Sequence, residues 1–329
     1  MTIDNNIERA YRDAIAAAKN GDYMNAIVGL TKVLDGIRFR CNQESGQSQE
    51  SHSITLEKVL YKRAGAWMER KEYEIALLDI NEALRESPRK SDYYSARARI
   101  RRELFQYGLA ISDLCIAIEY DPNISDYYFQ RSVVYLLDSN PQAALQDIEK
   151  AIELASPDDD VMQYYYVQRA KIFFKLKKYE NALDDCERVQ SSDNPYADVF
   201  SVAGETYVEL KEFAKAQEMI SKLDEMEPES RRYHFFRAKY YFEQNDWKRA
   251  KLFCDSYIEF DRRSWEAIQL RGECHFWLSD LNNAEIDCKR AYSIKQNPKS
   301  CETLANIYSK RKDIMSSDDW NKKKSQFKE

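Results

Sequence analysis

Arginine and aspartate recur in this chain as pairs sixteen residues apart. The pairs are Arg63 with Asp79, Arg97 with Asp113, Arg131 with Asp147, Arg169 with Asp185, and Arg271 with Asp287. The two residue types appear together in the same segments and are absent together from others, although Arg237 faces Phe253 at the equivalent spacing. Co-occurrence favours a repeated Arg–Asp bridge between packed helices over a reactive charge constellation.

Residues for catalysis or metal binding do not form a recognisable set. The chain has no Gly-rich phosphate loop, no His-Glu-x-x-His and no nucleophile elbow. Its three histidines, His52, His234 and His275, are far apart in sequence, and its carboxylates are spread as solvated helix faces. We therefore expect no catalytic, cofactor or metal site, and we predict that the protein is not an enzyme.

Seven cysteines are present, an odd number, with no Cys-x-x-Cys pair. Three of them, Cys186, Cys254 and Cys288, share one equivalent repeat position, where a small buried hydrophobe is expected. Reduced cysteines fit a cytosolic setting. The start of the chain, Met1 to Ala18, lacks an apolar export segment, so we expect a cytoplasmic location.

Composition excludes two further classes. The net charge is −6 with both signs interspersed, which disfavours nucleic acid and anionic membranes as partners. No run of 18 or more apolar residues occurs, so we expect no membrane insertion. Only 8 glycines and 7 prolines against 32% charged residues indicate continuous helices with few loops.

A regular step of alanines reveals the elements that position these residues. Ala76, Ala110, Ala144, Ala182, Ala216, Ala250 and Ala284 are separated by 34, 34, 38, 34, 34 and 34 residues. A period in this range is typical of a solenoid, in which each unit buries its apolar face by stacking on its neighbours. With each alanine set at position 20, eight units lie near 7–40, 57–90, 91–124, 125–158, 163–196, 197–230, 231–264 and 265–298.

Other positions of the unit repeat as well. Position 8 is small throughout: Ala14, Ala64, Ala98, Ser132, Ala170, Gly204, Ala238 and Gly272. Position 11 is aromatic in most units: Trp67, Tyr135, Phe173, Tyr207 and Tyr241. Alanine returns at position 27, and a proline lies near position 32 in five units. Each unit therefore reads as a helical hairpin whose two helices approach closely where small residues face each other.

This pattern resembles the tetratricopeptide repeat over about residues 7 to 298. The resemblance implies an all-α fold, a right-handed α-solenoid superhelix of antiparallel helix pairs. It implies one solenoid over residues 1–312, with residues 299–312 as a capping helix. Three units depart from the pattern at position 11, where Ala17, Arg101 and His275 stand in place of an aromatic residue.

Two segments lie outside the regular register. We predict a polar loop insertion at 36–53 and a polar C-terminal tail at 313–329, which is made basic by Lys322 to Lys324 after Asn321 and by Lys328. The insertion could contact a partner or carry a regulated serine, or it could be a tolerated surface loop.

In the family, the first helix of each pair lines a concave groove through positions 2, 5, 9, 12 and 13. The matching candidate partner-binding residues are Tyr61, Arg99, Arg102, Phe129, Val133, Leu136, Val167, Lys171, Phe174, Arg232, Phe235, Lys239, Phe242, Phe276 and Trp277. Aromatic residues beside cations could hold apolar anchors and a carboxylate of a peptide. The two-carboxylate clamp that binds chaperone C-termini in some family members is absent.

The resemblance favours a scaffold or adaptor that binds a protein segment in the groove and assembles a multiprotein complex. Co-chaperone-like binding of apolar client segments is an alternative, because Tyr-Tyr pairs such as Tyr93-Tyr94 resemble repeats of luminal co-chaperones with a J-domain. We see no J-domain or signal peptide in the sequence. RNA binding and regulation of an enzyme in trans are further alternatives.

Overall fold

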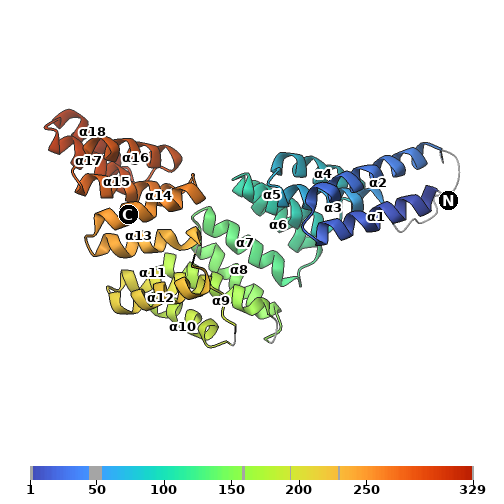
Figure 1. Ribbon diagram of the computed structural model, residues 1–329, viewed down its shortest axis with the longest axis horizontal. Helices are drawn as coiled ribbons and strands as arrows, with labels where there is room; N and C mark the ends of the chain where they lie inside the picture. The colour runs from blue at the N-terminus through green and yellow to red at the C-terminus, as the bar shows by residue number, and fades with distance from the viewer. Residues whose placement is uncertain (1–2, 44–53, 158–159, 193, 229, 328–329) are drawn as a thin grey trace. The chain divides into compact units, whose positions relative to one another are not determined.

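The computed structural model describes residues 3–43, 54–157, 160–192, 194–228 and 230–327. Within these ranges the chain forms eighteen α-helices, one short 3₁₀ helix and no strand (Figure 1). Its residues divide into two compact units, 1–172 and 173–329, and the division falls within helix α9. The all-α class and the solenoid of helix pairs are confirmed.

The N-terminal unit contains α1 to α8 and most of α9. The bounds are α1 (Ile3–Lys19), α2 (Tyr23–Gln43), α3 (Leu56–Glu69), α4 (Tyr73–Glu86), α5 (Ser91–Glu103), α6 (Tyr107–Tyr120), α7 (Ser125–Leu137), α8 (Pro141–Leu154) and α9 (Val161–Lys175). Each odd-numbered helix up to α7 packs on the helix that follows it and forms a hairpin (Figure 1).

The C-terminal unit begins with the end of α9 and continues to the last hairpin. The bounds are α10 (Tyr179–Gln190), α11 (Asp198–Glu209), α12 (Phe213–Met226), the 3₁₀ helix η1 (Arg231–Tyr233), α13 (His234–Glu243), α14 (Trp247–Phe260), α15 (Trp265–Trp277), α16 (Leu281–Ile294), α17 (Pro298–Lys310) and α18 (Ile314–Lys324). From α11 onward the helices again pair as hairpins.

Every hairpin turns through one residue in the left-handed region at position 15. These residues are Gly21, Lys71, Phe105, Ser139, Lys177, Lys211, Asn245, Ser279 and Lys312, with φ between 59° and 77°. In the α3–α4 turn, the Glu72 amide donates to the Trp67 carbonyl at 3.0 Å and the Lys71 amide to the Met68 carbonyl at 2.8 Å. These two hydrogen bonds form a helix C-cap and satisfy carbonyls at the end of the first helix.

The alanine step marks the closest helix contacts. The position-20 alanines are all 0% exposed, and the small residues at position 8 are buried as well. Position 8 is glycine in α11, because the ring of Phe236 from α13 lies against it: a Cβ on Gly204 would be 2.2 Å from Phe236 Cζ. Small residues at these two positions let the backbones of neighbouring helices approach.

The predicted loop at 36–53 is wrong for its first eight residues, because α2 continues as a helix to Gln43. Ile37 is 2% exposed, and Gly36 lies close enough to α1 that a Cβ there would be 3.1 Å from Ile7 Cγ1. Burial against α1 therefore extends this helix beyond the repeat. Residues 44–53 lie outside the described residues.

The predicted tail at 313–329 is also corrected, because α18 occupies Ile314–Lys324 and pairs with α17. The predicted capping helix is thus the first half of a further hairpin. Sequence periodicity misses it because position 20 is Ser317, one residue short of the 34-residue step from Ala284. The Ser317 hydroxyl donates to the Ala305 carbonyl at 3.0 Å, so this polar side chain can occupy a buried position.

Candidate functional site

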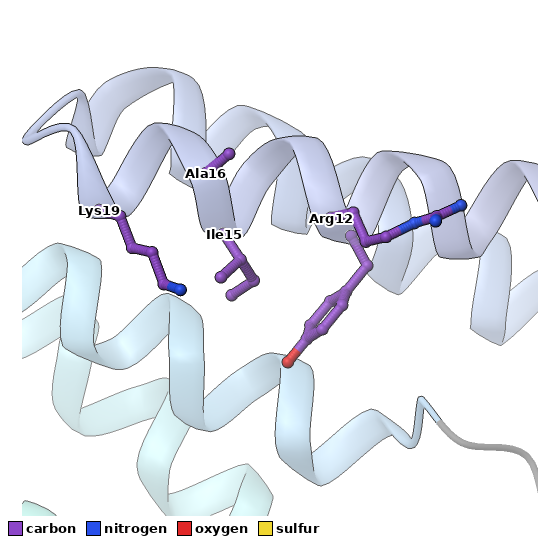
Figure 2. A pocket seen from close by; sticks show the side chains of 5 residues that line it. Arg12, Ile15, Ala16 and Lys19 are labelled. Carbon is purple, nitrogen blue, oxygen red and sulfur yellow. The ribbon is translucent and has the colours of Figure 1, made fainter.

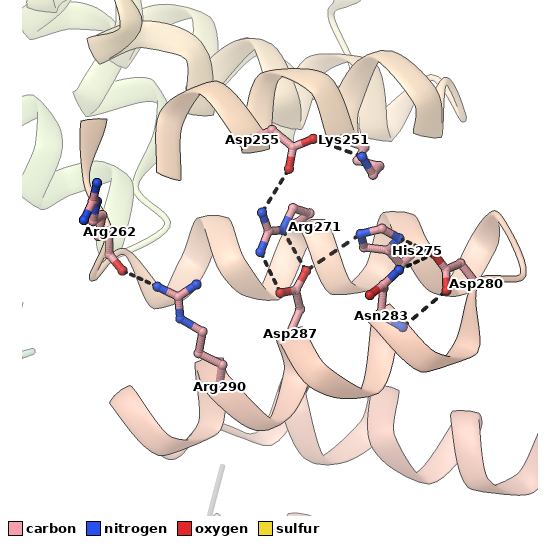
Figure 3. Close-up of polar contacts among 9 residues, drawn as sticks. All are labelled: Lys251, Asp255, Arg262, Arg271, His275, Asp280, Asn283, Asp287 and Arg290. Atoms are coloured by element: carbon pink, nitrogen blue, oxygen red, sulfur yellow. Dashed lines mark hydrogen bonds and ion pairs between the residues drawn. The ribbon is translucent and has the colours of Figure 1, made fainter. Parts of the chain in front are cut away.

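Arg271 of α15 lies between two carboxylates of neighbouring helices (Figure 3). Its Nε and Nη2 donate to the two oxygens of Asp287 at 2.7 Å, and its Nη1 donates to Asp255 Oδ1 of the preceding hairpin at 2.9 Å. The hydrogen bond to Asp287 is the main reason that the pKa of Arg271 is raised. This side chain therefore joins both helices of its own hairpin to the hairpin before it.

The same arrangement recurs in the N-terminal unit. Three arginines each make a bidentate contact with one aspartate at 2.7 to 3.0 Å: Arg63 with Asp79, Arg97 with Asp113, and Arg131 with Asp147. The Nη1 atom of each arginine also donates to a side chain of the preceding hairpin, which is Thr31, Asn81 and Cys115 respectively. The predicted structural role is confirmed for these four pairs. The pair Arg169 with Asp185 spans the two units and stays a prediction.

The histidines take part in packing. His275 is 9% exposed, with Nδ1 3.2 Å from Asp280 Oδ2 and Nε2 4.0 Å from Asp287 Oδ2 (Figure 3). His234 shares a hydrogen bond of 2.9 Å between Nδ1 and the Ser256 hydroxyl, and burial lowers its pKa. Both rings are held by neighbouring helices.

Among the described residues, no three His, Cys, Asp or Glu side chains come together as a metal site would require. His52 lies outside those residues. The helices that the structure describes also include none with the length and apolar character needed to cross a bilayer.

The predicted partner-binding residues of the N-terminal unit are mostly half-buried. On α7, Phe129, Val133 and Leu136 follow an i, i+4, i+7 spacing and are all partly exposed. Phe129 and Tyr61 each stack on a tyrosine of a following hairpin, with ring centroids 5.0 Å apart. Val167 is 2% exposed, so it belongs to the core and not to a binding surface.

The cations predicted in the same unit differ in their surroundings. Arg99 is exposed, whereas Arg102 Nη2 lies 2.6 Å from the carboxylate of Glu103. Lys171 is half-buried in α9. These positions give the N-terminal unit an apolar stripe on α7 and one open guanidinium on α5.

In the C-terminal unit, a second stripe of the same spacing lies on α13. Phe235, Lys239 and Phe242 are all partly exposed. The ammonium of Lys239 lies 2.7 Å from Glu205 and 4.8 Å from the centroid of Phe235. Its charge is therefore balanced by a carboxylate of α11, which weakens the expected attraction for an anionic ligand.

The remaining predicted residues of this unit are placed differently from one another. Arg232 is 2.7 Å from Asp198, and Phe174 is half-buried beside Tyr179. Phe276 is 8% exposed, but its neighbour Trp277 is 56% exposed. Of the candidate residues in this unit, Trp277 thus presents the largest open apolar side chain.

Two residues near Trp277 were missed from the sequence. Trp247 lies 5.5 Å from Trp277 between ring centroids, and Lys310 lies 3.9 Å above the ring of Phe276. Lys310 stands at position 13 of the last hairpin, equivalent to Trp277, but the shortened step hides that equivalence. Trp247 is the first residue of the second helix of its hairpin. An aromatic residue at this position is explained by packing within the hairpin, so the sequence did not mark it as a binding residue.

A buried polar cluster joins α15 to α17. Glu273 is 7% exposed, accepts a hydrogen bond from Gln269 Nε2 at 3.0 Å and lies 3.1 Å from Lys299 Nζ. Gln269 also donates to the Thr303 hydroxyl at 3.1 Å. Burial raises the pKa of Glu273, although Lys299 and Gln269 act in the opposite direction.

Replacement of Glu273 by glutamine is expected to stabilise the C-terminal unit more at neutral than at acid pH. A carboxyl whose folded-state pKa is raised supports folding below its unfolded value of 4.5, and that support is lost as the pH rises through the folded value. The difference in unfolding free energy between Glu273→Gln and the parent should therefore grow from about pH 4 to about pH 7. Urea unfolding followed by tryptophan fluorescence measures it.

Glu285→Gln is the matched control, because the sign reverses. Hydrogen bonds from Lys289 and Tyr308, together with Arg311, lower the pKa of Glu285 to about 2. Glu285→Gln should then be less stable than the parent at neutral pH, and the deficit should shrink below about pH 4.5. A flat profile for Glu273→Gln would contradict the raised pKa of Glu273, and a flat profile for Glu285→Gln would contradict the lowered pKa of Glu285.

Two pockets lie away from the predicted residues. One, of about 290 Å³, is lined by Tyr11, Arg12, Ile15, Ala16 and Lys19 of α1, and Figure 2 shows Ile15 and Lys19 on the same side of that helix. The other, of about 570 Å³, lies against the last hairpin and includes Lys299, Glu302 and Phe327. Neither contains a predicted partner-binding residue.

Comparison with known proteins identifies the repeat. Two family profiles, both described as tetratricopeptide repeat, match residues 202–268 and 164–196. Tetratricopeptide repeat protein 12 of Mus musculus is 34% identical over 67 residues, which is 20% of this chain and 10% of that protein. DnaJ homolog subfamily C member 3 of Gallus gallus is 27% identical over 180 residues, 54% of this chain and 31% of that protein. The matches thus span less than a third of either relative.

Solved structures share the fold at low sequence identity. The APC/C hetero-tetramer Cut9-Hcn1 superposes with a TM-score of 0.60 at 9% identity, over 86% of this chain and 55% of that one. The human IFIT1 dimer with PPP-AAAA gives 0.58 at 13% identity, over 95% and 88%. The pilF protein of Pseudomonas aeruginosa gives 0.54 at 16% identity, over 72% and 99%.

Proposed function

The chain is built of tetratricopeptide repeats, and on that premise we propose that it is a non-enzymatic scaffold whose first helices bind a segment of a partner protein and help assemble a complex. Repeats of this kind form protein–protein interaction scaffolds. The proposal places the protein in the cytoplasm, because none of its seven cysteines is joined in a disulfide within the described residues.

The observation that carries the proposal is a pair of side-chain stripes on first helices, one wholly apolar and one in which two phenylalanines flank a lysine. Phe129, Val133 and Leu136 on α7 share their i, i+4, i+7 spacing with Phe235, Lys239 and Phe242 on α13. All six side chains are partly exposed after their own hairpins are packed. Such a stripe offers anchoring contacts to an extended or helical segment.

Two stripe variants test the proposal against a matched control. Val133→Ala/Leu136→Ala alters the α7 stripe, and Phe235→Ala/Phe242→Ala alters the α13 stripe. Loss of a buried anchor commonly costs about 2 kcal/mol or more, so binding of a recovered partner should weaken at least tenfold in one of them. Affinity purification from native extract, followed by titration of the purified partner, measures the loss.

Leu252→Ala/Ile286→Ala is the control. These side chains, 64% and 62% exposed, lie on the second helices α14 and α16. The control should bind like the parent, and all three proteins should keep their helical circular dichroism. A partner that survives both stripe variants and is lost with the control would overturn the proposal and move binding to the second helices.

A second function, the holding of apolar client segments, is favoured by the likeness to the DnaJ homolog and by open side chains such as Trp277 and Leu252. It predicts that equimolar protein suppresses aggregation of heat-denatured citrate synthase. RNA is disfavoured, because the net charge is −6 and the candidate cations Lys239 and Arg232 are paired with carboxylates. Retention on heparin at moderate salt would reverse that judgement.

A further inference from the structure

Aromatic rings of two successive hairpins, α13–α14 and α15–α16, meet around Trp277 in the C-terminal unit. Trp277 of α15 lies 5.5 Å from Trp247 of α14, and Trp247 lies 6.2 Å from Phe242 of α13. Phe276 contacts Trp277 edge to face at 5.4 Å. The helices that carry these rings follow one another in Figure 1. We name Phe242, Trp247, Trp277 and Lys310 the Trp277 surface.

Exposure distinguishes this surface from the core. Phe242 and Trp247 are half-buried and support Trp277, whose side chain is 56% exposed. A supported tryptophan costs little conformational entropy when it binds, because its rings are already held in place. The packing of its own hairpin does not require the exposed face of Trp277. This face is therefore available as an anchor for a binding partner.

Lys310 places a positive charge directly beside these rings. Its ammonium lies 3.9 Å from the centroid of Phe276 and 5.9 Å from that of Trp277. Throughout the part of the chain that the structure describes, it makes no ion pair with a carboxylate. All three of its N–H donors are thus available to an incoming acceptor.

Neighbouring charges are already balanced. Lys299 lies 3.1 Å from Glu273, and Glu243 of α13 pairs with Lys211 in the turn after α11. On α16, Glu285 pairs with Lys289. Because these carboxylates have partners of their own, the uncompensated charge beside Trp277 is the positive charge of Lys310.

We propose that the Trp277 surface binds an acidic peptide segment in which a carboxylate lies next to a bulky apolar side chain. The apolar side chain packs on the exposed face of Trp277, and the carboxylate accepts a charge-assisted hydrogen bond from Lys310. The rings lower the local dielectric around this contact and strengthen it. The inference rests on the proposed scaffold function and adds the chemistry of the segment at its C-terminal end.

Matched fluorescein-labelled peptides test the proposal on the full chain. The probe is Gly-Ser-Asp-Glu-Phe-Asp-Glu-Leu-Ser-Gly, compared with versions in which the acids become amides, become lysines, or in which Phe and Leu become Ala. Fluorescence anisotropy should show binding of the acidic probe and at least tenfold weaker binding of each other peptide. Trp277→Ala and Lys310→Glu should each weaken the acidic probe at least tenfold.

Lys322→Glu is the control, because it makes the same charge change at an exposed position of α18. Binding by Lys322→Glu should match the parent. Tighter binding of the lysine peptide would overturn the proposal and identify a site for cations. Equal binding of the amide peptide, or full binding by Lys310→Glu, would also overturn it.

Failure here is distinguishable from failure of the scaffold function. If the acidic probe does not bind, but Val133→Ala/Leu136→Ala, which leaves every residue of the Trp277 surface intact, still loses a native partner, the scaffold function stands and this inference falls. If the probe binds through Trp277 but neither stripe variant loses a partner, the stripes are not the binding site of the scaffold, whereas the peptide chemistry assigned to the Trp277 surface stands.

Discussion

Replacement of Gly204 by alanine is expected to destabilise the C-terminal unit by about 3 kcal/mol. The added Cβ would lie 2.2, 2.6 and 2.9 Å from Cζ, Cε1 and Cε2 of Phe236. Phe236 is 1% exposed, so its ring cannot move away without opening the core. Urea unfolding by tryptophan fluorescence measures the effect, because four of the five tryptophans lie in this unit.

Gly65→Ala is the matched control, because it makes the same chemical change in α3, where a Cβ would meet nothing within 4 Å. At this exposed helical site alanine should stabilise by up to about 1 kcal/mol. In the Gly204→Ala background, Phe236→Leu should recover part of the loss. If Gly204→Ala proves as benign as Gly65→Ala, the contact between α11 and α13 is looser than described.

Replacement of Asp113 by alanine is the second large effect that we expect. Asp113 is 1% exposed and accepts from two guanidiniums, Arg97 at 2.7 Å and Arg101 at 2.6 Å. Removal leaves two poorly solvated cations together, and loss of one partner of a buried pair costs about 3–5 kcal/mol. Hydrogen exchange of the α5 and α6 amides should show the loss in the N-terminal unit.

Asp79→Ala provides the comparison, because Asp79 binds the single arginine Arg63. It should destabilise less than Asp113→Ala. Conversion of both Arg63 and Asp79 to leucine should cost less than Asp79→Ala alone, because no buried charge is left unpaired. Equal costs for Asp79→Ala and Asp113→Ala would mean that Arg101 gains nothing from Asp113.

The sequence predicted those features that repeat with the helix pairs. Ala76 and its equivalents defined the close contacts, and Arg271 with Asp287 was correctly assigned as a bridge. Prediction failed where one residue is missing from the step: Ser317 replaces the alanine, so the last hairpin was interpreted as a capping helix followed by a tail. It failed also at Gly36, where a breaker residue lies inside α2 because it packs on α1.

The candidate site was less predictable, because exposure depends on neighbouring hairpins. Phe276 and Trp277 are adjacent aromatic residues, yet Phe276 is 8% exposed and Trp277 is 56% exposed. Lys239 was correctly placed beside aromatic rings, but its pairing with Glu205 depends on the separation of α11 and α13, which periodicity does not reveal. An equivalent position in the repeat predicts which way a side chain points from its helix. Whether a charged side chain finds a partner of opposite charge can be seen only in the packed structure.

The left-handed residue at position 15 has a consequence for how such a chain can change. Eight of these nine sites carry a side chain, including Phe105 and Lys211, and each holds a conformation that costs an ordinary residue about 1 kcal/mol. The turn is thus enforced by the helices on either side and not by the identity of the residue between them. Glycine at several of these positions would therefore raise the melting temperature in small additive steps, while the helices on either side of each turn keep their places.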